Sequence, residues 1–171
     1  MMKRPETGFT LVEMVAALTV LALLAAIVGP LLSNGVRAYN DSASAVHTLS
    51  KLRVASERLL REIREIRRDG SGNFDISLPL SPTSLQFFKT DSEQVTISTT
   101  APLLTLAYAG IGGTPVLSDE VSAFSFSYIQ ADGSLPAIDN SDVAFIEFEL
   151  VLTHAGNNYP QRSRIALRNQ P

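Results

Sequence analysis

Hydrophobic residues form one long, nearly unbroken run near the start of the chain. The run covers Phe9 to Leu32, where 19 of 24 residues are apolar and Glu13 is the only charged one. As a helix it would be about 36 Å long, which is enough to cross a hydrocarbon layer of roughly 30 Å. A buried core helix rarely has this length with a single charge. The pattern therefore predicts a membrane-spanning helix over residues 9–32.

Beyond Pro30 the apolar residues recur at spacings of three and four, the period of a helix with one buried face. The stripe consists of Val46, Leu49, Leu52, Ala55 with Ser56, Leu59, Ile63 and Ile66. The opposite surface is charged and carries Lys51, Arg53, Glu57, Arg58, Arg61, Glu62, Arg64, Glu65, Arg67 and Arg68. Glu57 and Arg61 stand in the favourable i,i+4 order, and Gly70 supplies a stop. We predict an amphipathic helix over residues 33–69 that continues the first.

After Gly72 the period changes from 3.6 to 2, and turn residues separate short apolar segments. The predicted strands are Leu85–Lys89, Gln94–Thr99, Leu103–Ala109, Ala123–Gln130, Val143–Thr153 and Arg162–Arg168. Each has one apolar face and one polar face, as expected of an antiparallel sheet that is wet on one side. Gly110-Ile111-Gly112-Gly113 reads as a hairpin turn. Residues 70–171 are therefore predicted to form an antiparallel β head, and the fold class is α+β.

The last two strands also predict their own register. With Gly156-Asn157-Asn158 as the turn, Phe148 pairs with Leu167, Leu150 with Ile165, and Glu147 with Arg168. This arrangement matches apolar to apolar side chains and acid to base, each pair contributing about 0.2 to 1 kcal/mol. The basic C-terminus is then expected to neutralise an acidic strand, without a ligand.

Charge is distributed in three zones, although the net charge is only −3. Residues 1–69 hold 10 basic and 7 acidic groups, residues 70–161 hold one lysine and 10 acids, and residues 162–171 hold three arginines. There is no global basic excess, and the arginines of the helix are interleaved with acids and lack aromatic neighbours, so nucleic acid is not an expected partner. The chain has no cysteine, which excludes disulfides, thiolate metal sites and cysteine nucleophiles.

Positive charge lies on one side of the apolar run. Lys3 and Arg4 precede it, and the first basic residue after it is Arg37, so the N-terminus is expected in the cytoplasm and the rest of the chain outside. Three interpretations then remain open. The run is an uncleaved anchor, a secretory signal cut after Val36-Arg37-Ala38 and before Tyr39, or a helix processed at its head.

Glu13 distinguishes these interpretations. An ionised carboxylate inside a membrane helix costs about 2.5 to 3.5 kcal/mol and therefore needs a partner. The residues within helical reach are Phe, Thr, Ala and Ala, and none is basic. Cutting the chain between Gly8 and Phe9 would create a suitable charge, a free α-amino group. A conventional signal peptide leaves Glu13 unexplained.

Lys3-Arg4, then Gly8-Phe9-Thr10-Leu11-Val12-Glu13, then the apolar run resemble the class III leader of type IV pilin-like proteins. The resemblance implies a leader of residues 1–8, cleavage by prepilin peptidase between Gly8 and Phe9, and N-methylation of Phe9. It also implies an assembly contact in which Glu13 meets the Phe9 amine of a neighbouring subunit, which helps to set the register.

The resemblance further implies an inner-membrane protein with a periplasmic head that assembles with other pilin or pseudopilin subunits. Gly29 and Pro30 fall where many pilins bend their N-terminal helix, and a proline weakens the helical ladder there. A head of this length without a disulfide loop is similar to a minor pilin or minor pseudopilin of a type IV pilus, an MSHA-type pilus or a type II secretion system, of the J, W or MSHA-O kind. The alternative is a secreted or membrane-anchored periplasmic binding domain with a conventional signal.

Other candidate sites point to no catalysis, cofactor, metal or small-molecule substrate. His47 and His154 are the only histidines and read as surface residues. No Gly-x-Ser-x-Gly elbow surrounds a serine, and the Gly110 turn lacks the lysine and helix of a phosphate loop. The oxygen-rich segment 132–142 lacks the EF-hand spacing and is interpreted as an acidic solvated loop, with calcium left open. We therefore expect a structural protein rather than an enzyme.

Overall fold

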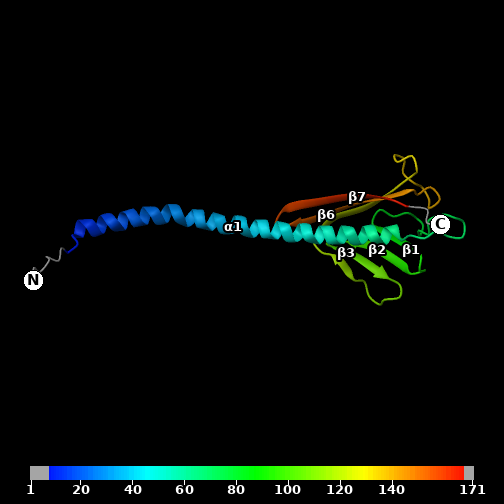
Figure 1. Ribbon diagram of the computed structural model, residues 1–171, viewed down its shortest axis with the longest axis horizontal. Helices are drawn as coiled ribbons and strands as arrows, with labels where there is room; N and C mark the ends of the chain where they lie inside the picture. Colours follow the sequence, from blue (N-terminus) through cyan, green and yellow to red (C-terminus); the bar gives the residue numbers. More distant parts are fainter. Residues whose placement is uncertain (1–7, 168–171) are drawn as a thin grey trace, which may run out of the picture. The chain divides into compact units, whose positions relative to one another are not determined.

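The computed structural model describes residues 8–167, and their fold is α+β, as predicted (Figure 1). Within these residues one helix, α1 (Leu11–Arg64), precedes seven strands. The strands are β1 (Ser84–Phe88), β2 (Gln94–Thr100), β3 (Leu103–Tyr108), β4 (Val116–Ser118), β5 (Val121–Ile129), β6 (Phe145–His154) and β7 (Asn157–Ala166). They form two antiparallel sheets, of order β1-β2-β3-β4 and β5-β6-β7.

The chain divides into two compact units, with the boundary between Ser44 and Ala45 inside α1. In the first unit, residues 8–43 are all exposed, and this part of α1 is long and apolar enough to cross a membrane. The helix runs unbroken through Pro30. The bend expected at Gly29 and Pro30 therefore stays a prediction.

The second unit, which we call the head, has one hydrophobic core to which α1 and both sheets contribute. The helix supplies the side chains of Leu52, Ala55, Leu59 and Ile63, and Ile66 joins them from just beyond the end of the helix. The first sheet supplies Leu85, Phe87, Val95, Ile97, Leu104 and Leu106, and the second supplies Phe124, Phe126, Ile146, Phe148, Leu150 and Leu152. In β1, β2 and β3 the buried residues alternate with more exposed ones, which is the pattern that predicts strands.

The predicted helical stripe is right only from Leu52 onward. Val46 and Leu49 are 68% and 49% exposed, whereas Thr48, one turn before Leu52, is buried. The helix also ends at Arg64 instead of Asp69. Beyond it the backbone forms β-bridges, with Ile66 opposite Lys89 and Arg68 opposite Phe74, so these residues exchange helical for strand-like hydrogen bonds.

The six predicted strands are present, but β4 was missed and the register of the last hairpin was wrong. β4 has three residues, too few to show a period of two. In the last hairpin Glu147 pairs with Arg164 and Phe148 with Ser163, while Arg168 lies outside the described residues. The turn is Ala155-Gly156, both with positive φ (49° and 80°), the geometry that suits a two-residue hairpin. The shift is an even number of residues, so each side chain keeps its face.

Candidate processing and assembly site

The start of α1 is fixed by Thr10. Gly8, Phe9 and Thr10 are not helical, and the helix begins at Leu11. The N–H of Glu13 donates to Thr10 Oγ1 (3.3 Å), and the N–H of Met14 donates to the Thr10 carbonyl (3.1 Å). Thr10 is therefore the N-cap residue, and Thr10 with Glu13 forms the Thr-x-x-Glu sequence of a capping box. Our sequence predictions missed this role, although the three-residue spacing was a sufficient signal.

Phe9 and Glu13, the predicted assembly residues, both lie on the open surface of this unit. Phe9 is 79% exposed, and Glu13 borders an open groove with Ala16, Ala17 and Val20. Among the described residues Glu13 forms no ion pair; its backbone N–H is bound to Thr10. As the third helical residue, its carboxylate is well placed to offset the positive end of the helix dipole. The structure thus gives Glu13 a local role at the helix start but no cationic partner within residues 8–167.

The apolar side chains that follow are uncovered on every side of the helix. The exposed fractions of its large hydrophobic residues up to Leu32 run from 46% at Val28 to 81% at Leu11. Soluble monomers rarely expose a continuous apolar surface of this extent. Lipid or the apolar surface of other protein molecules must therefore cover this part of the helix.

The two glycines of the predicted site meet no steric demand from their own chain. Apart from its chain neighbours and, for Gly29, the adjacent helix backbone, a Cβ atom built on Gly8 or Gly29 meets nothing within 4 Å, and neither residue has a positive φ. Thr19, a further polar residue within the apolar run, has partners in its own helix, because its hydroxyl donates to the Val15 and Ala16 carbonyls (2.9 and 2.8 Å). Glu13 is then the one side chain of the run that carries an unpaired charge among the described residues.

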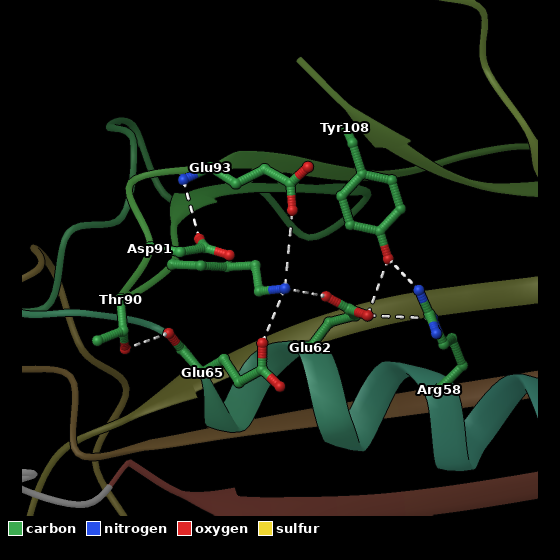
Figure 2. Close-up of polar contacts among 8 residues, drawn as sticks. Arg58, Glu62, Glu65, Thr90, Asp91, Glu93 and Tyr108 are labelled. Carbon is green, nitrogen blue, oxygen red and sulfur yellow. Dashed lines mark hydrogen bonds and ion pairs between the residues drawn. The ribbon is translucent and has the colours of Figure 1, made fainter. Parts of the chain in front are cut away.

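The head has its own buried carboxylate, Glu62, which was predicted to lie on the charged surface opposite the apolar stripe and is instead buried. Its side chain is only 3% exposed. Arg58 Nε and the Tyr108 hydroxyl approach its Oε1 (3.0 and 2.8 Å), and the Tyr108 hydroxyl also accepts a hydrogen bond from Arg58 (Figure 2). Lys89 Nζ lies 3.4 Å from Oε2. Glu62 therefore joins α1 to residues of the first sheet.

Lys89 completes this ionic cluster from the loop after β1. Its ammonium lies 2.8 Å from Glu65 and 3.8 Å from Glu93, as well as near Glu62. The hydrogen bond with Glu65, helped by the charge of Glu62, outweighs burial and raises the pKa of Lys89. Lys89 thus stays charged at neutral pH and contacts the carboxylates of the cluster in a largely buried setting. No sequence period marks this cluster, because its members come from separate elements.

A second acidic residue, Glu147 on β6, is covered by two arginines of β7. Arg162 Nε and Arg164 Nε donate to its two oxygens (2.7 and 3.0 Å). Burial raises the pKa of Glu147, but the hydrogen bonds from both arginines outweigh this effect and hold the pKa below its usual value. The expected neutralisation of an acidic strand by the basic C-terminal strand is confirmed, with Arg162 and Arg164 in place of Arg168.

His154 belongs to a surface network that links α1 to the connection between β4 and β5 and to the end of β6. His154 Nδ1 lies 2.7 Å from Glu120, and Lys51 bridges Glu120 and Asp119 (3.2 and 2.8 Å). His47 borders the same groove as Lys51 and Asp119. Within residues 8–167 no group of three His, Asp or Glu side chains is arranged to hold a metal ion.

The acidic loop between β5 and β6 uses its carboxylates in its own turns. Asp132 accepts the N–H groups of Ser134 and Leu135 (both 3.0 Å), and Asp139 accepts that of Ser141 (2.9 Å). The hydrogen bonds from the serine backbone and side chains lower the pKa of both aspartates. These carboxylates are therefore occupied as turn caps.

Comparison with known protein families agrees with this geometry. Residues 3–29 match the family model of the prokaryotic N-terminal methylation motif, a range that includes Gly8, Phe9, Glu13 and Gly29. The curated proteins contain no match to the chain. The chain thus carries the prokaryotic N-terminal methylation motif at the head of a membrane-capable apolar helix, which is followed by antiparallel β-sheets.

Proposed function

We propose that this protein is a structural subunit of a type IV pilus or a type II secretion pseudopilus. It is inserted in the inner membrane with its N-terminus in the cytoplasm, cut by prepilin peptidase between Gly8 and Phe9, methylated at Phe9 and then assembled with other subunits. The observation that carries the proposal is Glu13, which has no ion pair within residues 8–167 and lies at the head of an exposed apolar helix inside the methylation motif.

The physical argument begins with the environments that this helix can enter. In lipid, or between packed apolar helices, the Glu13 carboxylate is costly without a cation. Cleavage supplies that cation as the Phe9 ammonium of a neighbouring subunit, and charge pairing in a dry setting is strong and directional. Apolar contacts between helices replace the lipid contacts of the membrane-bound subunit. One pairing therefore favours both the departure from the membrane and a fixed stagger between neighbours.

We further infer a minor subunit that acts in filament initiation or at the tip. The chain has no cysteine, so it lacks the disulfide loop of many major pilins. The head instead relies on its hydrophobic core and on the clusters around Glu62 and Glu147. Within this proposal the role is structural, with partners of protein and lipid.

The mass of the mature N-terminus tests the processing step. Purified from its native membranes, the protein is expected to begin with N-methyl-Phe9. A protein that begins at Tyr39 would instead support the secreted binding domain, in which a signal peptidase cuts within the segment that forms α1. An uncut chain would support a membrane anchor. Either of these results contradicts the proposal.

Incorporation into filaments tests the charge pairing. Glu13→Gln keeps the side chain's shape and removes its charge, so it is expected to reduce the amount of the protein in sheared filaments. Thr19→Val is the matched control, because it changes a polar residue of the same apolar run whose hydroxyl is bound only within its own helix. Entry of Glu13→Gln at the wild-type level would show that the pairing is not needed.

A further inference from the structure

The helix start described above lies very close to the predicted scissile bond. Thr10, the N-cap residue, is separated from the Gly8–Phe9 bond by one residue, and the chain from Gly8 to Thr10 is not helical. An N-cap residue takes a non-helical backbone conformation while its side chain binds the N–H of the third helical residue. The cap therefore decides on which side of the helix boundary the scissile bond falls.

We propose that Thr10 is a positioning residue for cleavage: its cap stops α1 from extending back through Phe9 and Gly8, so that the scissile bond is presented to the peptidase in an open conformation. This inference rests on the proposed function, in which prepilin peptidase cuts between Gly8 and Phe9. It adds a role for Thr10 in the conformation of the scissile bond, which is separate from the roles of the Glu13 charge and of Gly8.

The chemistry of the step shows why an open conformation matters. The oxygen of a water molecule adds to the Gly8 carbonyl carbon, the bond to the Phe9 nitrogen breaks, Gly8 leaves as a carboxylate, and the Phe9 amine takes up a proton. In a helix that included Gly8, its carbonyl would accept the N–H of Val12 and would be enclosed by the first turn. Locally open segments are cut in preference to hydrogen-bonded ones.

The sequence before the bond contains a competing signal for a helix start. Proline is favoured at the first position of a helix, and an acidic residue is favoured in the first turn. Pro5 followed by Glu6 therefore offers a competing helix start, and a helix that began there would include Gly8 and Phe9. Glycine opposes this extension only in part. The Thr10 cap adds the local preference that keeps the start at Leu11.

Gly8 and Thr10 then have separable roles. A Cβ at Gly8 has open space around it, so the fold of this chain does not require glycine there. Thr10, in contrast, is bound to its own backbone through Oγ1. We therefore assign Gly8 to recognition by the enzyme and Thr10 to the conformation of the substrate.

Cleavage kinetics of the full-length precursor test this assignment, with membranes that contain the precursor mixed with purified prepilin peptidase. Thr10→Val keeps the shape of the side chain and removes its oxygen. We expect it to raise KM by about three- to thirtyfold, the range that the loss of an N-cap spans, because only the open fraction of the substrate binds. The value of kcat should stay the same. Thr10→Ser and Thr10→Asn, which are both good N-caps, should restore the wild-type KM.

Hydrogen exchange supplies a second measurement that does not depend on the enzyme. In Thr10→Val the amide of Val12 should gain protection, because it would bind the Gly8 carbonyl of the extended helix. A wild-type KM for Thr10→Val, or an unprotected Val12 amide, overturns the inference. The inference also fails if Thr10→Asn has the same raised KM as Thr10→Val, because the enzyme would then be recognising threonine itself. A wild-type chain that is not cut at Gly8–Phe9 overturns the proposed function as well, whereas cleavage that ignores the cap overturns only this inference.

Discussion

The two parts of α1 have opposite relations to their apolar side chains. From Ala45 onward the helix buries residues such as Leu59 and Ile63 in the core of the head, whereas before Ser44 its apolar residues are exposed. Each part also has one carboxylate among apolar neighbours. Glu62 has Arg58, Tyr108 and Lys89 of its own chain as partners, and Glu13 has no ion pair within the described residues.

This difference separates what one chain can complete from what it cannot. The head satisfies its core and its buried charge internally, so its stability should respond to changes in its own residues. The first part of the helix also has apolar residues and a carboxylate, but its apolar side chains are exposed and are not part of the core. Its side chains should therefore matter for membrane insertion and assembly and leave the stability of the head unchanged.

A matched pair of leucine substitutions gives the largest expected effect. Leu59→Ala should lower the free energy of unfolding of the head by about 3 to 5 kcal/mol, because it leaves a cavity at a fully buried position. Leu21→Ala, at a position 63% exposed, should leave it unchanged. Denaturant unfolding of the full-length chain in detergent, followed by the near-UV circular dichroism of tyrosine, measures both. Equal losses would mean that the two parts of α1 are not energetically distinct.

The buried carboxylate gives the next largest effect. Glu62→Gln should destabilise the head by about 2 to 3 kcal/mol, because Arg58 and Lys89 lose a buried counter-charge. Glu57→Gln is the control, since Glu57 pairs with Arg53 on the exposed face of the same helix and should cost at most about 0.5 kcal/mol. The same unfolding measurement compares the two variants. If Glu57→Gln costs as much as Glu62→Gln, burial does not distinguish these carboxylates.

Substitution of Glu147 should have a smaller effect on the stability of the head, and this effect should depend on pH. The pKa of Glu147 in the folded head lies below the usual value of 4.5, so its contribution is complete above about pH 4.5 and is lost as the pH falls through the folded pKa. Glu147→Gln should therefore cost roughly 1 to 2 kcal/mol at pH 7, with Arg162 and Arg164 partly exposed to solvent. The difference from wild type should shrink as the pH is lowered from 4.5. A difference that stays constant down to pH 3 would contradict this assignment.

The sequence predicts those features that depend on local periodicity. The apolar run, the amphipathic stripe from Leu52 and six of the seven strands all follow from repeated spacings of 3.6 or 2. Gly8, Phe9 and Glu13 are predicted as site residues because their order along the chain forms a motif, and the range of the family match includes them. These predictions needed no knowledge of which elements meet.

Features that depend on contacts between distant elements were not predictable in this way. Glu62 has the helical spacing of a surface residue, and only Lys89 and Tyr108, 27 and 46 positions later, make it a buried one. Val46 and Leu49 fit the apolar stripe but are exposed. The last register failed for another reason. Asn157-Asn158 is a strong turn signal, whereas the actual turn begins with Ala155, a residue type that rarely has a positive φ.

Substitutions of Ala155 should have the smallest effect on the stability of the head, and they also test whether the head and the first unit are independent. Ala155→Asn creates the Asn-Gly pair preferred in turns of this kind and should stabilise the head by about 0.5 to 1 kcal/mol, whereas Ala155→Val should destabilise it, because a β-branched residue resists φ near 49°. Unfolding of the full-length chain shows both signs. Cleavage at Gly8–Phe9 should be the same in both variants, since the first unit makes no use of head stability. A cleavage rate that follows the stability of the head would show that the two units are coupled.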